Sequence, residues 1–143
     1  MSSFNKHFEG CASNIMTNAI VFPGITLEDM TLETPRHYVD NALWDTGAQV
    51  TIISKQMANS LGLTPYGKAG LMGIGGDNVV DTYRIHVLLP NGFLVDDVEA
   101  YCSDIEDDLI IGMDIISLTD FVITNIDGNT HFSMRAPAEG VEI

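Results

Sequence analysis

Short apolar and β-branched runs, separated at close intervals by turn residues, are the feature that most constrains how this chain can fold. Turn signals stand at Pro23-Gly24, at Pro90-Asn91-Gly92 and at Asp127-Gly128-Asn129. This rhythm is typical of an all-β barrel or sandwich rather than of alternating strands and helices. We find no internal repeat and no linker, and 143 residues suffice for one domain with one core.

The pattern also predicts individual elements. Ser54 is a candidate N-cap for a short helix over residues 55–61 that Gly62 would end, and a second short helix is expected over residues 114–118. Residues 1–15 are polar and irregular, and we expect a loose N-terminal arm followed by a single domain over residues 16–143. Strands are predicted over residues 19–22, 25–32, 37–44, 49–53, 66–71, 79–89, 93–101, 109–112, 121–126 and 130–134.

Charge and composition exclude several classes of partner. The net charge of −14 argues against nucleic acid and against anionic membrane surfaces as partners. No apolar run approaches the roughly 20 residues of a membrane-spanning helix. The first residues do not look like a secretory signal, so we expect a cytoplasmic protein. Cys11 and Cys102 could bridge each other, but in a reducing compartment we expect two free thiols.

Metal and cofactor sites are not expected. The four histidines are scattered without HxxxH or HExxH spacing, and the acidic residues 104–108 lack the pattern of an EF-hand loop. The glycine-rich stretch at residues 73–76 lacks the lysine of a phosphate-binding loop and opens no convincing helix. A hairpin is the better interpretation of that stretch, with Ile74 as a candidate tip residue.

The segment Asp45-Thr46-Gly47 follows a predicted strand and is the candidate catalytic site. Two carboxylates can hydrolyse a peptide bond when one accepts a proton from a water molecule and the other, protonated, polarises the scissile carbonyl. Two acids a few Å apart share one proton and titrate as a pair. The Thr46 hydroxyl can stiffen the loop, and Gly47 permits a tight turn next to the carboxylate. A simple bend between two strands would use the same residue types.

The wider pattern resembles the retropepsin-like aspartic protease family, in particular its cellular and bacterial single-domain members. The resemblance rests on residues 45–54 (DTGAQVTIIS), on residues 109–114 (LIIGMD) and on the glycine-rich stretch between them, and it covers residues 18–136. It implies a closed β-barrel of the acid-protease fold. It assigns catalysis to Asp45, Thr46 and Gly47, substrate contacts to Ala48 and to a flap at Gly73, Ile74, Gly75 and Gly76, and support of the active-site loop to Ile110, Ile111 and Gly112.

One Asp-Thr-Gly triplet per chain leads to an expectation about assembly. The chemistry needs two acids, and a two-fold axis beside Asp45 would supply the second. We therefore expect a homodimeric aspartic endopeptidase that acts on peptide or protein substrates without a cofactor. The alternative is a catalytically silent peptide-binding or dimerisation module of the same fold. Met113 stands where viral members usually have arginine, which puts in doubt any salt bridge from that position to the dimer interface.

Overall fold

The computed structural model describes residues 2–73 and 76–143, and β-strands dominate it. Two short α-helices, α1 (Lys55–Ser60) and α2 (Met113–Ile116), and one 3₁₀ turn, η1 (Leu27–Asp29), interrupt the strands. The strands are β1 (Ser3–His7), β2 (Ile15–Pro23), β3 (His37–Trp44), β4 (Ile52–Ser54), β5 (Gly67–Gly73), β6 (Gly76–Leu88), β7 (Leu94–Ser103), β8 (Leu109–Ile111), β9 (Asp120–Ile126) and β10 (Asn129–Arg135).

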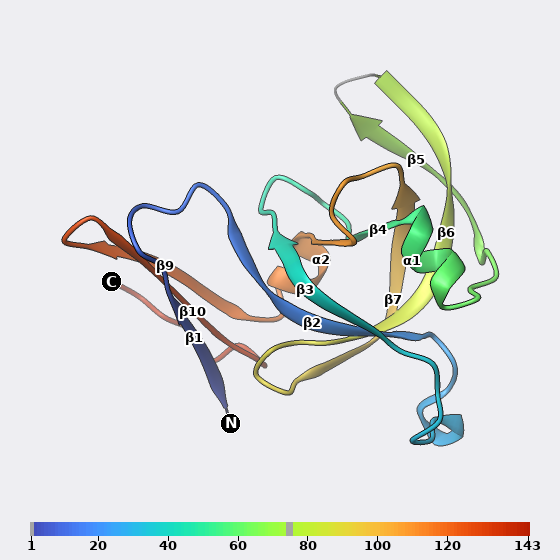
Figure 1. The fold of residues 1–143 in the computed structure, drawn as a ribbon, viewed down its shortest axis with the longest axis horizontal. Coiled ribbons are helices and arrows are strands. Elements are labelled where there is room, and N and C mark those ends of the chain that lie inside the picture. Colours follow the sequence, from blue (N-terminus) through green and yellow to red (C-terminus); the bar gives the residue numbers. More distant parts are fainter. Residues whose placement is uncertain (1, 74–75) are drawn as a thin grey trace.

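Six of these strands form a closed barrel. The strand order is β2-β3-β8-β4-β7-β6, and the pairing of β2 with β6 closes the ring. Strand β6 is long enough to pair with three neighbours: its first half pairs with β5, and its second half pairs with β2 and β7. The β5–β6 hairpin therefore projects from the barrel, at the upper right of Figure 1. The predicted all-β barrel is confirmed.

A second, three-stranded sheet has the order β1-β10-β9 and lies at the left of Figure 1. An aromatic cluster joins it to the barrel: the ring of Trp44, at the end of β3, lies 5.7 Å from that of Phe121 and 5.4 Å from that of Phe132. The buried Trp44 indole also donates a 2.9 Å hydrogen bond to the Thr17 hydroxyl. Such tilted aromatic pairs pack densely, so the two sheets share one core.

Local sequence accounts for several elements. Along β2, residues 15, 17, 19 and 21 are buried, which is the period of two expected of a strand with one face in a core. Helix α1 begins where predicted, because the Ser54 side chain accepts a 3.1 Å hydrogen bond from the Met57 amide. Gly62, at φ +62°, follows the helix in the left-handed conformation that glycine adopts most easily.

Two expectations need correction. Residues 3–7 do not belong to a loose arm: they form β1, which pairs with β10 in antiparallel register from Ser3 opposite Arg135 to His7 opposite His131. The strand expected over residues 25–32 is also wrong, because the 3₁₀ turn η1 lies there. The Thr26 hydroxyl donates a 2.7 Å hydrogen bond to the Asp29 carboxylate, a local bond that favours a turn over an extended strand.

Over residues 2–73 and 76–143, none of the helices has both the length and the apolar character needed to cross a bilayer.

Candidate active site

The loop between β3 and β4 carries Asp45 and is held in place by its own backbone. The Ala48 amide donates a 3.1 Å hydrogen bond to the Asp45 carbonyl, which closes a tight turn. The Gly47 amide donates a 2.8 Å hydrogen bond to Oδ1 of Asp45. A Cβ atom on Gly47 would lie 3.1 Å from that same oxygen, so glycine gives the carboxylate its room. The turn thus orients one half-buried carboxylate per chain.

Strand β8 braces this loop from below. Leu43 and Trp44 of β3 pair in parallel with Ile110 and Ile111, and the Asp45 amide donates a 2.9 Å hydrogen bond to the Ile111 carbonyl. On its other side, β8 pairs with Ile52 and Ile53 of β4. The two chain segments that flank the aspartate are therefore tied to the same short strand, and the aspartate cannot shift without moving β8.

Gly112 brings the end of β8 into contact with the loop backbone. A Cβ atom at this position would lie 3.0 Å from the Ala48 carbonyl oxygen and still closer to the carbonyl group of Val50. Next to it, the Met113 amide donates a 2.8 Å hydrogen bond to the Ala48 carbonyl. Only a residue without a side chain permits this approach, and the loop residue Ala48 is fixed as a result.

A further support was not predicted from the sequence. The Asp114 carboxylate accepts hydrogen bonds from the Thr51 amide (3.0 Å), the Thr51 hydroxyl (2.8 Å) and the Ile115 amide (2.9 Å). The Thr51 hydroxyl is fully buried and also lies 3.4 Å from the Gly112 amide, which points toward it. Thr51 and Asp114 therefore couple the loop that carries Asp45 to helix α2. Their separation of 63 residues hides this pair from any local pattern.

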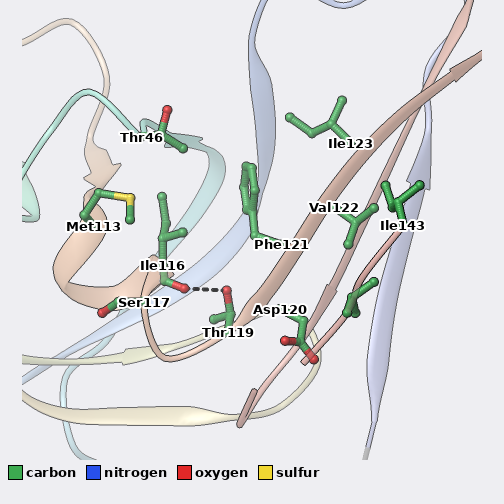
Figure 2. A pocket seen from close by; sticks show the side chains of 11 residues that line it. Thr46, Met113, Ile116, Ser117, Thr119, Asp120, Phe121, Val122, Ile123 and Ile143 are labelled. Atoms are coloured by element: carbon green, nitrogen blue, oxygen red, sulfur yellow. Dashed lines mark hydrogen bonds between the residues drawn. The ribbon is translucent and has the colours of Figure 1, made fainter. Parts of the chain in front are cut away.

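Thr46 is exposed and lies at the rim of a groove beside the loop that carries Asp45 (Figure 2). The groove has a volume of about 710 Å³, and side chains from α2 and β9 line it together with Val141 and Ile143. Figure 2 shows Thr46 and Met113 on one side of the groove and Phe121 and Ile123 on the other. The groove places an apolar surface directly beside the Asp-Thr-Gly segment.

The predicted glycine-rich hairpin is formed by β5 and β6. The pairing runs from Gly67 opposite Thr82 to Gly73 opposite Gly76, so these two glycines stand at the end of the hairpin. Ile74 and Gly75, which are also predicted to contact substrate, lie outside the described residues. Within the described ranges, no cluster of three or more histidine, cysteine or acidic side chains could hold a metal ion.

A closed β-barrel that holds an Asp-Thr-Gly loop against an Ile-Ile-Gly strand defines the acid-protease class of folds. Comparison with known families is consistent with that class. The chain belongs to the family of retropepsin-like aspartic proteases, because the family model described as "gag-polyprotein putative aspartyl protease" matches residues 37–117, more than half of the chain. A search of curated proteins finds no match.

Two solved structures share the fold. The EIAV protease in complex with the inhibitor HBY-793 superposes with a TM-score of 0.55 at 20% sequence identity, over 73% of this chain and 86% of that chain. A retropepsin-like aspartic protease from Rickettsia conorii gives a TM-score of 0.55 at 12% identity, over 94% of both chains. At these identities the likeness concerns the fold alone. The second match extends over nearly the whole chain, including the ends that the family model leaves out.

Proposed function

We propose that this protein is a homodimeric aspartic endopeptidase in which each chain contributes one catalytic carboxylate, that of Asp45. The observation that carries the proposal is the fixed geometry of this residue. Its Oδ1 atom accepts the Gly47 amide, whereas no donor within residues 2–73 and 76–143 reaches its Oδ2 atom. One oxygen is thus oriented by the loop, and the other is available to a water molecule or to a second acid.

The reaction follows from two such carboxylates and one water molecule. The ionised carboxylate takes a proton from the water, and the resulting nucleophile attacks the scissile carbonyl carbon. The protonated carboxylate donates a hydrogen bond to the carbonyl oxygen and stabilises the charge that develops there. Transfer of a proton to the leaving nitrogen then breaks the C–N bond. Because both acids lie close together, they share one proton, which favours activity below neutral pH.

The second carboxylate comes from a second chain in this proposal. Asp-Thr-Gly occurs once in the sequence, and a residue close to a two-fold axis meets its own copy. Thr46 is exposed beside Asp45, so its hydroxyl is available for a hydrogen bond to the partner loop across the axis. Gly47 and Ala48 form the floor on which the substrate lies.

The β5–β6 hairpin is the candidate flap. It projects from the barrel, and Gly73 pairs with Gly76 at its end. An extended peptide between this hairpin and the loop floor would pair with backbone groups on both sides, as in strand addition. Ile74 and Gly75 complete the proposed substrate contacts.

The test is digestion of an unstructured protein such as casein between about pH 4 and 7, by wild type and by Asp45→Asn. We expect wild type to cleave and Asp45→Asn to lose at least about 10³-fold in rate, because the substitution replaces both acids of the homodimer with amides that cannot exchange a proton. The matched control is Asp40→Asn, which replaces an exposed aspartate on the same strand, β3, and should leave the rate unchanged. A statine-type inhibitor should raise the melting temperature of wild type.

Equal activity of wild type and Asp45→Asn would refute the proposal. No cleavage by a wild-type protein that is demonstrably dimeric, together with no shift by the inhibitor, would favour the alternative of a silent peptide-binding or dimerisation module.

A further inference from the structure

Two histidines from opposite ends of the sequence meet on the three-stranded sheet. His7 is the last residue of β1 and stands directly opposite His131 of β10. Their rings are stacked, with centroids 4.1 Å apart and planes 9° from parallel. His7 is exposed and His131 is half-buried, so the pair lies on the solvent face of the sheet. No spacing along the chain reveals this pair, because only the pairing of β1 with β10 brings the two rings together.

The other two histidines differ from this pair because their rings are already engaged. His86 is buried, and both of its ring nitrogens are hydrogen-bonded to backbone groups. The His37 ring lies 3.1 Å from the Asp108 carboxylate. Over residues 2–73 and 76–143, by contrast, no hydrogen bond or ion pair engages the ring of His7 or of His131. The ring nitrogens of the stacked pair are therefore available to a ligand from solution.

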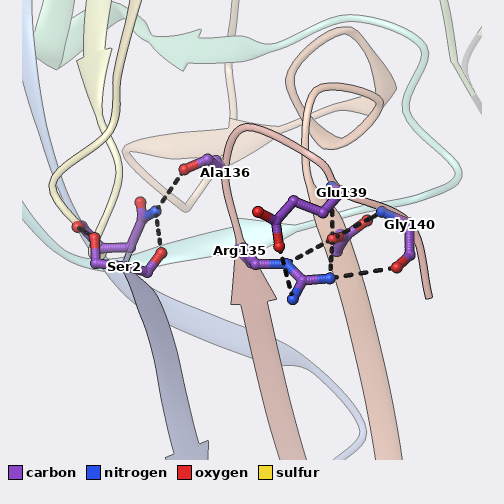
Figure 3. Close-up of polar contacts among 7 residues, drawn as sticks. Ser2, Arg135, Ala136, Glu139 and Gly140 are labelled. Atoms are coloured by element: carbon purple, nitrogen blue, oxygen red, sulfur yellow. Dashed lines mark hydrogen bonds and ion pairs between the residues drawn. The ribbon is translucent and has the colours of Figure 1, made fainter.

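The charges around the histidine pair favour a cation as that ligand. Lys6 precedes His7, but its side chain lies on the opposite face of the sheet, where its ammonium donates a 2.6 Å hydrogen bond to the Met16 carbonyl. Arg135, further along β10, is neutralised by Asp120 at 2.6 Å (Figure 3). The chain as a whole carries a net charge of −14, which raises the concentration of cations near its surface. The two nearby basic side chains thus do little to repel an approaching metal ion.

The start of β1 is held to the barrel by a polar anchor. The Ser2 hydroxyl donates a 2.6 Å hydrogen bond to the Asn91 carbonyl, which lies in the turn between β6 and β7. The Asn91 side-chain amide donates hydrogen bonds to the carbonyls of Ser2 (3.1 Å) and Ala136 (3.3 Å), which Figure 3 shows. The histidine pair lies at the other end of the same strand, so an ion bound there would fix β1 at both ends.

Two imidazole rings at this separation can chelate one ion. A Zn²⁺–N bond is about 2.0 to 2.1 Å long, so two nitrogens bound to one tetrahedral ion lie about 3.3 Å apart. Rotation about χ2, a soft torsion in histidine, can tilt rings whose centroids are 4.1 Å apart until one nitrogen of each reaches that distance. Imidazole is a preferred ligand of divalent zinc, copper and nickel.

We propose that His7 and His131 bind a divalent transition-metal ion of the Zn²⁺ class as a bidentate pair, and that the ion pins β1 to β10. Among the described residues, no third histidine, cysteine or acidic side chain joins the pair, so water fills the remaining positions on the ion. The inference does not depend on the proposed protease activity, because it uses only contacts of the three-stranded sheet and its anchor.

The ion would stabilise the fold by mass action. A ligand that binds the folded state and not the unfolded chain shifts the equilibrium toward the folded state as its concentration rises. The two histidines come from opposite ends of the chain, so the unfolded chain does not hold both of them at one ion. Strand β1 gains most from this effect, because its polar sequence, SFNKH, gives it little tendency to form a strand without β10.

The decisive experiment is calorimetric titration of the full-length chain with ZnCl₂ at pH 7.5 in a buffer that does not bind metal ions. We expect one ion per chain. His7→Gln and His131→Gln should each weaken binding at least about tenfold, because a chelate depends on the high local concentration of its second ligand. The matched control is His37→Gln, which removes the histidine next to Asp108 and should change the affinity less than about twofold, because it lies outside the pair.

Hydrogen exchange followed by mass spectrometry measures whether the ion pins the strand. Zn²⁺ should slow the exchange of the β1 amides at least about threefold in wild type and leave it unchanged in His7→Gln. Mg²⁺ prefers oxygen ligands and should have neither effect. Circular dichroism establishes that the variants are folded, and should His131→Gln fail to fold, His7→Gln and His7→Asn at the exposed position provide the same test.

Each outcome supports or overturns the inference. If Zn²⁺ binds wild type and His7→Gln equally well, the ion lies elsewhere on this acidic chain and the inference falls. If only one of the two histidines affects binding, the pair does not chelate and the inference falls as well. If wild type binds no Zn²⁺, the stacked rings are a structural contact alone. None of these results bears on cleavage by Asp45.

Discussion

Replacement of Gly112 by alanine tests whether the loop that carries Asp45 and strand β8 are held in contact by the absence of one side chain. The added Cβ would lie within 3.0 Å of three backbone atoms, the carbonyl carbon and oxygen of Val50 and the carbonyl oxygen of Ala48. Backbone atoms cannot rotate away as a side chain can. Relief of the contact requires a separation of about 0.5 to 1 Å, because ordinary contacts of a Cβ begin near 3.4 Å.

The expected loss of stability follows from the contacts that this separation disturbs. Gly112 has φ −93° and ψ −176°, a backbone conformation that alanine adopts without strain, so the cost is one of packing alone. Overpacking of this kind costs about 1 to 3 kcal/mol. The hydrogen bond from the Met113 amide to the Ala48 carbonyl, 2.8 Å long, crosses the same contact and adds about 1 kcal/mol if it breaks. We therefore expect Gly112→Ala to lower the free energy of unfolding by about 2 to 4 kcal/mol.

Equilibrium unfolding in urea measures this value. The matched control is Gly70→Ala, another glycine within a strand, whose added Cβ would meet no atom within 4 Å; its effect should stay within about 0.5 kcal/mol of zero. Equal unfolding free energies for Gly112→Ala and wild type would refute the reasoning, because the loop and β8 would then be able to separate freely.

Two further predictions concern titrating groups. Burial raises the pKa of the Cys102 thiol, whereas Cys11 is exposed, so iodoacetamide at pH 7.5 should label Cys11 at least about ten times faster than Cys102. Mass spectrometry measures which cysteine is labelled first, and preferential labelling of Cys102 would contradict its burial. The Glu139 amide and then Arg135 hold the pKa of Asp120 below its ordinary value. Because the pKa of Asp120 is lower in the folded protein than in the unfolded chain, its contacts with Arg135 and with the Glu139 and Gly140 amides stabilise the fold fully above about pH 4, the pKa of an aspartate in the unfolded chain. This stability is lost as the pH falls through the lower pKa of Asp120 in the folded protein. An NMR titration of the Asp120 carboxyl carbon with a midpoint at or above about 3.9 would contradict the effect of these contacts.

The sequence predicts elements whose causes are local. The predicted strand over residues 37–44 coincides with β3, which ends at the turn that carries Asp45. The predicted cap at Ser54 places the start of α1 correctly, since the hydrogen bond it makes spans only three residues. The Ile-Ile-Gly run is recognisable because a buried strand must be continuously apolar.

Features that depend on distant partners could not be predicted in this way. Strand β1 carries the polar sequence SFNKH, which gives no strand signal by itself, and it becomes a strand only because β10 pairs with it. Two side-chain contacts also join residues that are separated along the chain. One is the ion pair of Asp120 with Arg135, and the other is the hydrogen bond from Thr51 to Asp114. The candidate catalytic loop is thus visible in the sequence, whereas most of the contacts that hold it are tertiary.

The pairing of β1 with β10 imposes an order on biosynthesis. All six strands of the barrel are complete once Ile111 has been made, but β1 must wait for residues 129–135 before it has a partner. A nascent chain can therefore close its barrel around Trp44 while the three-stranded sheet and the segment that Asp120 anchors do not yet exist. The segment that Asp120 anchors therefore takes its place only after the residues of β10 have been made.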